Sequence, residues 1–320
     1  MSTEQSEFRY RPVEGWPTLP DGYLLGDVNG IALNSKGEVF VFSRGTHSIL
    51  VFSHEGEVLR TWGEGVFVRP HSIVIDKDDI IYCVDDRGHA VHKFSPDGDL
   101  LMTIETAANP ADTGYVAGQL GSVRVAGPPF NTPTDIALSP SGELYVTDGY
   151  GNARVHKFSA DGTWVLSWGE PGAGPGQFLL PHGLGVDADG LVYVADRENN
   201  RVQIFTPEGR YLREWNDLVR PSQVRFDEAG HVYVAEVGPA FKRDDPYPGD
   251  FAGGWFTVRD RQGKVLARLG EREPMWAPHG IAVSGDDVYV GSVTVSHGKG
   301  LFSSNRLARI RRNSGATGWS

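Results

Sequence analysis

The chain repeats one pattern of residues six times, and this repeat restricts its fold more than any other feature. Each copy opens with a short apolar run, continues through a turn such as Asp189-Gly190 and two more β-rich runs, and ends with a fourth run near a tryptophan. The copies begin at Asn29, Pro70, Pro133, Pro181, Pro221 and Pro278. Four short strands thus occupy each unit of roughly 40 residues or more, and helical periodicity is absent at convincing length. We expect an all-β fold, a six-bladed β-propeller with four antiparallel strands per blade, formed by residues 1–320 as one domain.

The two ends of the chain are expected to meet in the last blade. The sixth copy offers three strands, at 280–283, 287–290 and 307–311, and then runs into a polar tail. Residues 1–26 belong to no repeat, so we expect a segment within them to supply the missing strand and cover the open edge. Two Gly/Pro-rich stretches, 107–131 and 238–254, break the period and are predicted to be lids or rim loops.

Three histidines occupy one position of the repeat. His71, His182 and His279 each follow a proline at the start of the first strand, in the second, fourth and sixth copies. In a closed ring of six blades these side chains would lie about 120° apart around the axis. Three neutral imidazoles that converge on one point form a zinc ligand set with an open fourth position.

Strand direction places three further residues on the same face of the ring. Each histidine lies in the connection from one blade to the next, and the loops between second and third strands open on that face as well. These loops carry Arg44, Tyr150 and Arg197. Guanidinium groups bind carboxylates through paired hydrogen bonds, and a tyrosine beside a cation can act as a general base. We expect a small-molecule or short peptide-like substrate that carries a carboxylate.

Composition excludes several classes of partner. The formal net charge is -11, from 41 acidic and 30 basic residues, and there is no basic run, so we expect no binding to nucleic acid. The start of the chain is polar and no stretch approaches the length of a membrane span, so we expect no membrane partner. With the single cysteine, Cys83, these features indicate a cytoplasmic protein.

The chain resembles the peptidyl-α-hydroxyglycine α-amidating lyases and their bacterial-type relatives of the NHL-repeat class. The resemblance covers nearly the whole chain and is most specific at 130–135, 145–152, 180–184 and 194–199. It implies a six-bladed propeller that binds zinc through three histidines. Matched by motif, the zinc ligands are His71, His182 and His279, the catalytic tyrosine is Tyr150, and the two active-site arginines are Arg44 and Arg197.

Two features of that family are missing from this sequence. The family's structural calcium uses an aspartate directly after the third histidine, where this chain has Gly280. The backbone carbonyl groups of Val28 and Ile73 match the other calcium ligands, but carbonyl groups and water alone would bind calcium weakly. Gly151 stands where the family has a cysteine after the catalytic tyrosine, so its disulfides are not expected.

The first hypothesis for function is a zinc lyase that cleaves an N-substituted α-hydroxyglycine, or a similar carbinolamide, into an amide and glyoxylate, with no further cofactor. The second is a metal-dependent hydrolase of lactones or esters on the same scaffold. Such hydrolase sites favour carboxylate ligands around calcium, and three histidines on the axis argue against this hypothesis. The third is a non-catalytic NHL-type interaction scaffold, a class that needs no histidines on its axis.

Overall fold

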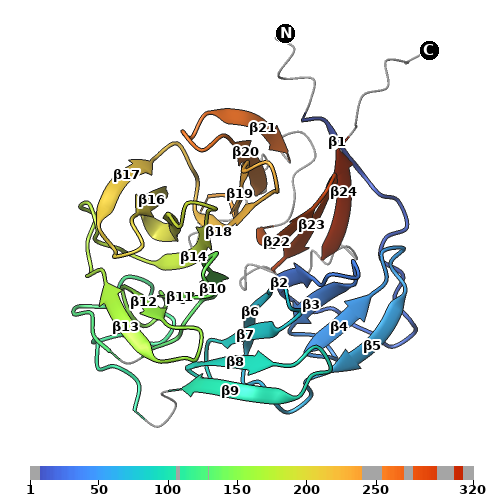
Figure 1. Ribbon diagram of the computed structural model, residues 1–320, viewed down its shortest axis with the longest axis horizontal. Coiled ribbons are helices and arrows are strands. Elements are labelled where there is room, and N and C mark those ends of the chain that lie inside the picture. Colours follow the sequence, from blue (N-terminus) through green and yellow to red (C-terminus); the bar gives the residue numbers. More distant parts are fainter. Residues whose placement is uncertain are drawn as a thin grey trace, which may run out of the picture.

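The protein is a ring of six four-stranded antiparallel sheets arranged around one axis (Figure 1). The computed structural model describes residues 8–105, 109–128, 130–239, 254–269, 277–293 and 306–312. Within these residues the helical structure is a single 3-10 turn, η1 (Arg197–Asn199). The predicted six-bladed β-propeller is confirmed. This part of the chain holds no helix with the length and apolarity needed to cross a bilayer.

The strands of the first three blades follow the order of the sequence. Blade 1 contains β2 (Val28–Leu33), β3 (Val39–Ser43), β4 (Ile49–Phe52) and β5 (Val58–Trp62). Blade 2 contains β6 (Pro70–Ile75), β7 (Ile81–Asp85), β8 (Ala90–Phe94) and β9 (Leu100–Glu105). Blade 3 contains β10 (Asp135–Leu138), β11 (Leu144–Asp148), β12 (Arg154–Phe158) and β13 (Trp164–Trp168).

The last three blades include the join between the chain ends. Blade 4 contains β14 (Pro181–Val186), β15 (Val192–Asp196), β16 (Arg201–Phe205) and β17 (Tyr211–Trp215). Blade 5 contains β18 (Pro221–Phe226), β19 (Val232–Glu236), β20 (Trp255–Arg259) and β21 (Val265–Leu269). Blade 6 contains β22 (Pro278–Ser284), β23 (Asp287–Ser292) and β24 (Leu307–Arg312), and β1 (Tyr10–Pro12) pairs antiparallel with β24 as its outermost strand.

The core of the protein lies between neighbouring blades. The second strand of every blade is buried at each of its residues, because another blade covers each face. This explains why these strands have near-continuous apolar sequences, whereas the outermost strands remain partly exposed. Phe40 and Phe42 of blade 1, for example, pack with Ile73 and Cys83 of blade 2. Truncating such a phenylalanine to alanine costs about 3–5 kcal/mol.

An ion pair crosses the ring between innermost strands. Asp135 opens β10, and both its carboxylate oxygens accept hydrogen bonds from the guanidinium of Arg225 in β18, at 3.1 Å each. Asp135 also accepts the backbone N–H of Leu184 at 3.0 Å and the hydroxyl of Ser72. Blades 2, 3, 4 and 5 therefore meet at one buried carboxylate. Since removing one partner of a buried pair costs about 3–5 kcal/mol, this contact helps to fix the centre of the ring.

Candidate active site

A bulge at the start of the innermost strand aims each predicted metal ligand at the axis. In β14, Pro181 pairs with Asp196 and Gly183 with Ala195, so His182 has no partner in the ladder. The same register shift leaves His71 and His279 unpaired in β6 and β22. A bulge bends the strand and redirects one side chain, which here turns each imidazole out of its own sheet.

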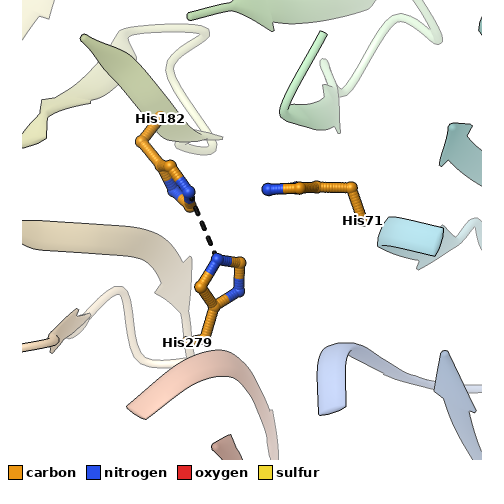
Figure 2. Close-up of side chains that lie close together, drawn as sticks. All are labelled: His71, His182 and His279. Carbon is orange, nitrogen blue, oxygen red and sulfur yellow. Dashed lines mark hydrogen bonds between the residues drawn. The ribbon is translucent and has the colours of Figure 1, made fainter. Parts of the chain in front are cut away.

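The three imidazoles meet in the centre of the ring, as Figure 2 shows. Their ring centroids are 5.0 Å apart for His71 and His182, 5.0 Å for His71 and His279, and 4.7 Å for His182 and His279. One nitrogen from each ring lies within 4.8 Å of the others. All three are buried, with exposed fractions between 1% and 4%. The alternate blades of the ring thus bring together residues that are more than 90 positions apart in sequence.

Backbone carbonyl groups of the intervening blades orient these rings. The Nδ1 atom of each histidine contacts one backbone carbonyl oxygen. The partner of His71 is Thr134. The partner of His182 is Ser222, at 2.8 Å, and the partner of His279 is Asn29, at 3.0 Å. A carbonyl oxygen can only accept, so each Nδ1 carries the proton and each Nε2 has a free lone pair. Thr134, Ser222 and Asn29 hold the equivalent position in blades 3, 5 and 1. The sequence analysis missed these partners, although the repeat register singles out the positions.

Burial keeps the imidazoles neutral. It lowers the pKa of His71 and His182 well below the ordinary histidine value and lowers that of His279 to about 3. The neighbouring guanidinium groups of Arg44 and Arg197 lower these pKa values further. Protonation would place a charge in a desolvated site that is already positive, so the rings are lone-pair donors at neutral pH.

The donor set fits a metal ion that prefers imidazole nitrogen. The Nε2 atoms of His182 and His279 are 3.2 Å apart, the contact drawn in Figure 2. Since both Nδ1 protons are engaged with carbonyl groups, both Nε2 atoms are acceptors and cannot hydrogen-bond to each other. A cation between them satisfies both, and three neutral nitrogen ligands suit zinc and related divalent metals.

Tyr150 brings its hydroxyl group to the same point. The phenolic oxygen lies 3.0 Å from Nε2 of His182 and 3.2 Å from Nε2 of His71, and the ring makes edge contacts with both imidazoles. The loop can approach this closely because a glycine stands on each side. A Cβ atom on Gly149 would lie 2.0 Å from the carbonyl oxygen of Pro181, and one on Gly151 would lie 2.2 Å from the side chain of Asn131.

Arg197 packs over the tyrosine. Its guanidinium carbon is 5.5 Å from the centre of the Tyr150 ring, and its Nε donates to Glu198 at 2.9 Å. Burial alone would lower the pKa of Arg197, but the neighbouring Tyr150 and Glu198 outweigh it and raise that pKa. The side chain therefore carries a fixed positive charge beside the phenol.

Arg44 lies on another part of the rim. Its Nε donates to the carbonyl oxygen of Pro70 at 2.9 Å, directly before His71, and its terminal nitrogens face Asp86 at 3.5 Å and Asp27 at 3.9 Å. Burial lowers the pKa of Arg44 below the ordinary arginine value. We call the space bordered by Arg44, Tyr150 and Arg197, above the three histidines, the mouth.

Buried carboxylates at the ends of second strands hold the histidine segments in place. Asp85 accepts the backbone N–H groups of Val68 and Arg69, just before His71, at 2.6 and 2.8 Å. In blade 4, Asp196 accepts those of residues 179 and 180, just before His182, at 3.0 and 3.2 Å. In these two blades the recurring acidic position of the repeat thus holds the segment that precedes a predicted metal ligand.

The predicted calcium site has little support in the packing of this chain. Val28 and Ile73 lie in β2 and β6, the innermost strands of adjoining blades. The Gly280 backbone packs directly against blade 1, and a Cβ atom there would lie 2.8 Å from the carbonyl oxygen of Asn29. An acidic ligand at this position would need a backbone shift, so these residues do not fit a carboxylate-containing calcium site.

One predicted rim loop borders the mouth. Within the stretch 107–131, Thr113 hydrogen-bonds the carbonyl oxygen of Gly151, and the Asn131 carbonyl accepts the N–H of Gly151 at 3.0 Å. These contacts tie the loop to the residue that follows Tyr150. Most of the other loop, 238–254, and the loop residue His297 lie outside the described residues.

Comparisons with known proteins identify the family of this chain. Residues 130–158 and 178–205 match the family model of the NHL repeat. Human NHL repeat-containing protein 3 is 33% identical over 256 residues, which cover 74% of this chain and 70% of that protein. A probable peptidyl-alpha-hydroxyglycine alpha-amidating lyase of Caenorhabditis elegans is 30% identical over 253 residues, 67% of each chain. Mouse peptidyl-glycine alpha-amidating monooxygenase is 30% identical over 325 residues, 89% of this chain.

The chain spans 31% of the length of the mouse monooxygenase. Among solved structures, a streptogramin B lyase has a TM-score of 0.62 at 14% identity, covering 98% of this chain and 100% of that chain, and this likeness concerns the fold alone. The sequence relatives show the family, since the Caenorhabditis elegans lyase is 30% identical and is covered over 67% of its length. The chain belongs to the peptidyl-α-hydroxyglycine α-amidating lyases, NHL-repeat proteins with a six-bladed β-propeller.

Proposed function

We propose that this protein is a zinc-dependent carbon–nitrogen lyase that cleaves an N-substituted α-hydroxyglycine to an amide and glyoxylate. The observation that carries the proposal is the position of the Tyr150 hydroxyl, 3.0 and 3.2 Å from two imidazole nitrogens and beside the guanidinium of Arg197. The candidate proton-transfer group, the candidate metal centre and the candidate carboxylate-binding cation thus lie next to one another.

The reaction breaks the C–N bond and the O–H bond of the α-hydroxyl group, and it needs no oxidant. The α-hydroxyl group loses its proton, and its oxygen becomes the aldehyde oxygen of glyoxylate. The electron pair of the C–N bond moves to nitrogen, which takes up a proton and becomes the amide nitrogen. Atoms and electrons balance with one substrate and two products.

The residues of the mouth match the demands of this reaction. Tyr150 is suited to move the proton at its phenolic oxygen, since a general base must lie within hydrogen-bond reach of the proton it takes. Arg197 and Arg44 supply fixed positive charges that bind the substrate carboxylate and orient its α-carbon. A bound zinc ion would add Lewis-acid chemistry at the three Nε2 atoms.

The alternative functions have less support. A lactonase-type site would favour carboxylate ligands, whereas the candidate metal cluster found among the described residues consists of three histidines. A scaffold without catalysis gives no reason for three buried lone-pair donors. We further propose a small or short peptide-like substrate, and a cytoplasmic setting in which the free Cys83 stays reduced.

The test is release of glyoxylate from N-acetyl-α-hydroxyglycine by the purified protein, followed by a colour reaction without oxidant or nicotinamide. Arg197→Ala should raise KM for substrates with a free carboxylate and should have a smaller effect on the corresponding methyl esters. Absence of glyoxylate from several acyl variants, together with hydrolysis of a lactone, would replace the lyase by the hydrolase.

A further inference from the structure

Two pairs of arginines stand at the mouth, and each pair shares one oxygen of a carboxylate. In the first pair, Arg44 and Arg69 both face Oδ2 of Asp86, at 3.5 and 3.2 Å. In the second pair, Arg197 and Arg220 both contact Oε1 of Glu198, at 2.9 and 2.8 Å. Asp86 is fully buried, so its charge is not screened by solvent.

These pairs place more guanidinium groups at the mouth than one substrate carboxylate can contact. Four guanidinium groups face two shared carboxylates, and Arg44 also faces Asp27 at 3.9 Å, in a chain whose net charge is -11. All four lie close enough to the histidines to lower their pKa values further after burial has done so. An α-hydroxyglycine supplies one carboxylate to this field.

Arg220 and Arg69, the second members of the two pairs, differ in how many of their donors contact the shared carboxylate. Arg220 uses both Nε and Nη2 on Glu198, at 3.3 and 2.8 Å, and its side chain is 13% exposed. Arg69 faces Asp86 through Nη1, and its side chain is 31% exposed. Its backbone is fixed, because its N–H donates to Asp85 at 2.8 Å and its carbonyl accepts the N–H of Asp86. Arg69 is therefore anchored through its backbone and keeps a partly exposed guanidinium group beside Arg44, whereas Arg220 positions Glu198 and Arg197.

We propose that Arg69 binds a second anionic group, on the N-acyl portion of the substrate, so that the preferred substrate is a dianion. The inference rests on the proposed function and narrows its substrate class. A carboxylate and a phosphate-type group share the chemistry that a guanidinium recognises. The carboxylate of the α-hydroxyglycine would bind at Arg197, beside Tyr150, and the second anion would bind at Arg69.

The test compares N-succinyl-α-hydroxyglycine with its neutral amide analogue, N-succinamoyl-α-hydroxyglycine, which has the same length. We expect kcat/KM to be about 10- to 100-fold higher for the succinyl substrate, the range that one charge-assisted contact gives. A 3-phosphonopropanoyl analogue is the third arm and decides which anion is preferred. In Arg69→Gln the ratio of the succinyl to the succinamoyl substrate should fall to near one, and Arg69→Lys should restore part of it.

Arg60→Gln is the matched control, because Arg60 lies on the outer strand β5 and pairs with Glu38 at 2.8 Å. It should leave the ratio unchanged. Equal kcat/KM for the charged and neutral substrates in the wild type, or an unchanged ratio in Arg69→Gln with a normal melting temperature, would overturn the inference and leave the lyase intact. Absence of glyoxylate from all three substrates would instead count against the lyase itself.

Discussion

Replacing Tyr150 by phenylalanine separates the chemistry of the site from its architecture. The substitution keeps the ring, and therefore the edge contacts with His71 and His182 and the contact with Arg197. It removes only the oxygen that lies 3.0 and 3.2 Å from the two imidazole nitrogens. Zinc content should remain at the wild-type level, because the proposed ligands are the three histidines.

The magnitude follows from the role of that oxygen. General acid–base catalysis contributes about 10²–10⁴-fold, so kcat should fall by this factor, which corresponds to about 3–5 kcal/mol in the barrier. Stability should change far less, since losing one hydrogen bond costs about 1 kcal/mol. Glyoxylate release, metal analysis and thermal unfolding measure the three quantities on one protein preparation.

A second tyrosine of the same blade provides the control. Tyr145 lies in β11, and its hydroxyl donates to the carbonyl oxygen of Pro207 at 3.3 Å, away from the mouth. Tyr145→Phe should lower stability by about 1 kcal/mol or less and leave kcat unchanged. The assignment of Tyr150 as the proton-transfer group would be refuted if Tyr150→Phe kept more than about a third of wild-type kcat, given the factor expected of such a group.

Three further predictions concern metal and pH. The purified protein should carry about one zinc per chain, and His182→Ala should lose most of this zinc while the ring stays folded. Metal analysis and circular dichroism test these two expectations, and full activity of the metal-free wild type would contradict them. Selective removal of calcium should barely change the melting temperature, because Gly280 packs against the Asn29 backbone without room for an acidic ligand; a shift of many degrees would mean that another ligand set binds calcium. Burial raises the pKa of Glu236 from 4.5 to about 7. Between these pH values the folded state keeps a proton that the unfolded state has lost, so the free energy of unfolding falls as the pH rises from 4.5 to about 7. At pH 8, Glu236→Gln should therefore be more stable than wild type by up to about 3 kcal/mol, with the difference vanishing near pH 4 in urea unfolding; a constant difference at all pH values would exclude the effect.

The repeat made the fold predictable because each copy carries its own strand and turn signals. The period located the four strands of a blade, and it placed His71, His182 and His279 at one structural position. The alternation of strand direction within a blade likewise placed Tyr150 and Arg197 on the face of the ring that carries the histidines. Local patterns suffice for these inferences, since strand direction and ring order follow from the repeat itself.

Contacts between blades could not be predicted in the same way. The carbonyl groups of Thr134, Ser222 and Asn29 orient the imidazoles, yet no property of these side chains marks the backbone oxygen as an acceptor. The shared carboxylates of the mouth were also missed. Glu198 could be seen as a neighbour of Arg197, but its second partner, Arg220, is 22 positions away and comes into reach only across the boundary between blades 4 and 5.

The sequence by itself therefore determined the kind of blade, the number of blades and the residues that face the axis, because all three are set by periodicity and by turns within a unit. Only the tertiary structure decided which lone pairs of the histidines are free, which carboxylate holds which arginine, and how much charge remains at the mouth. Those properties arise when strands of different blades close into a ring and lose their water. The carbonyl contacts then fix the tautomers of the histidines, and burial lowers the pKa values of the imidazoles.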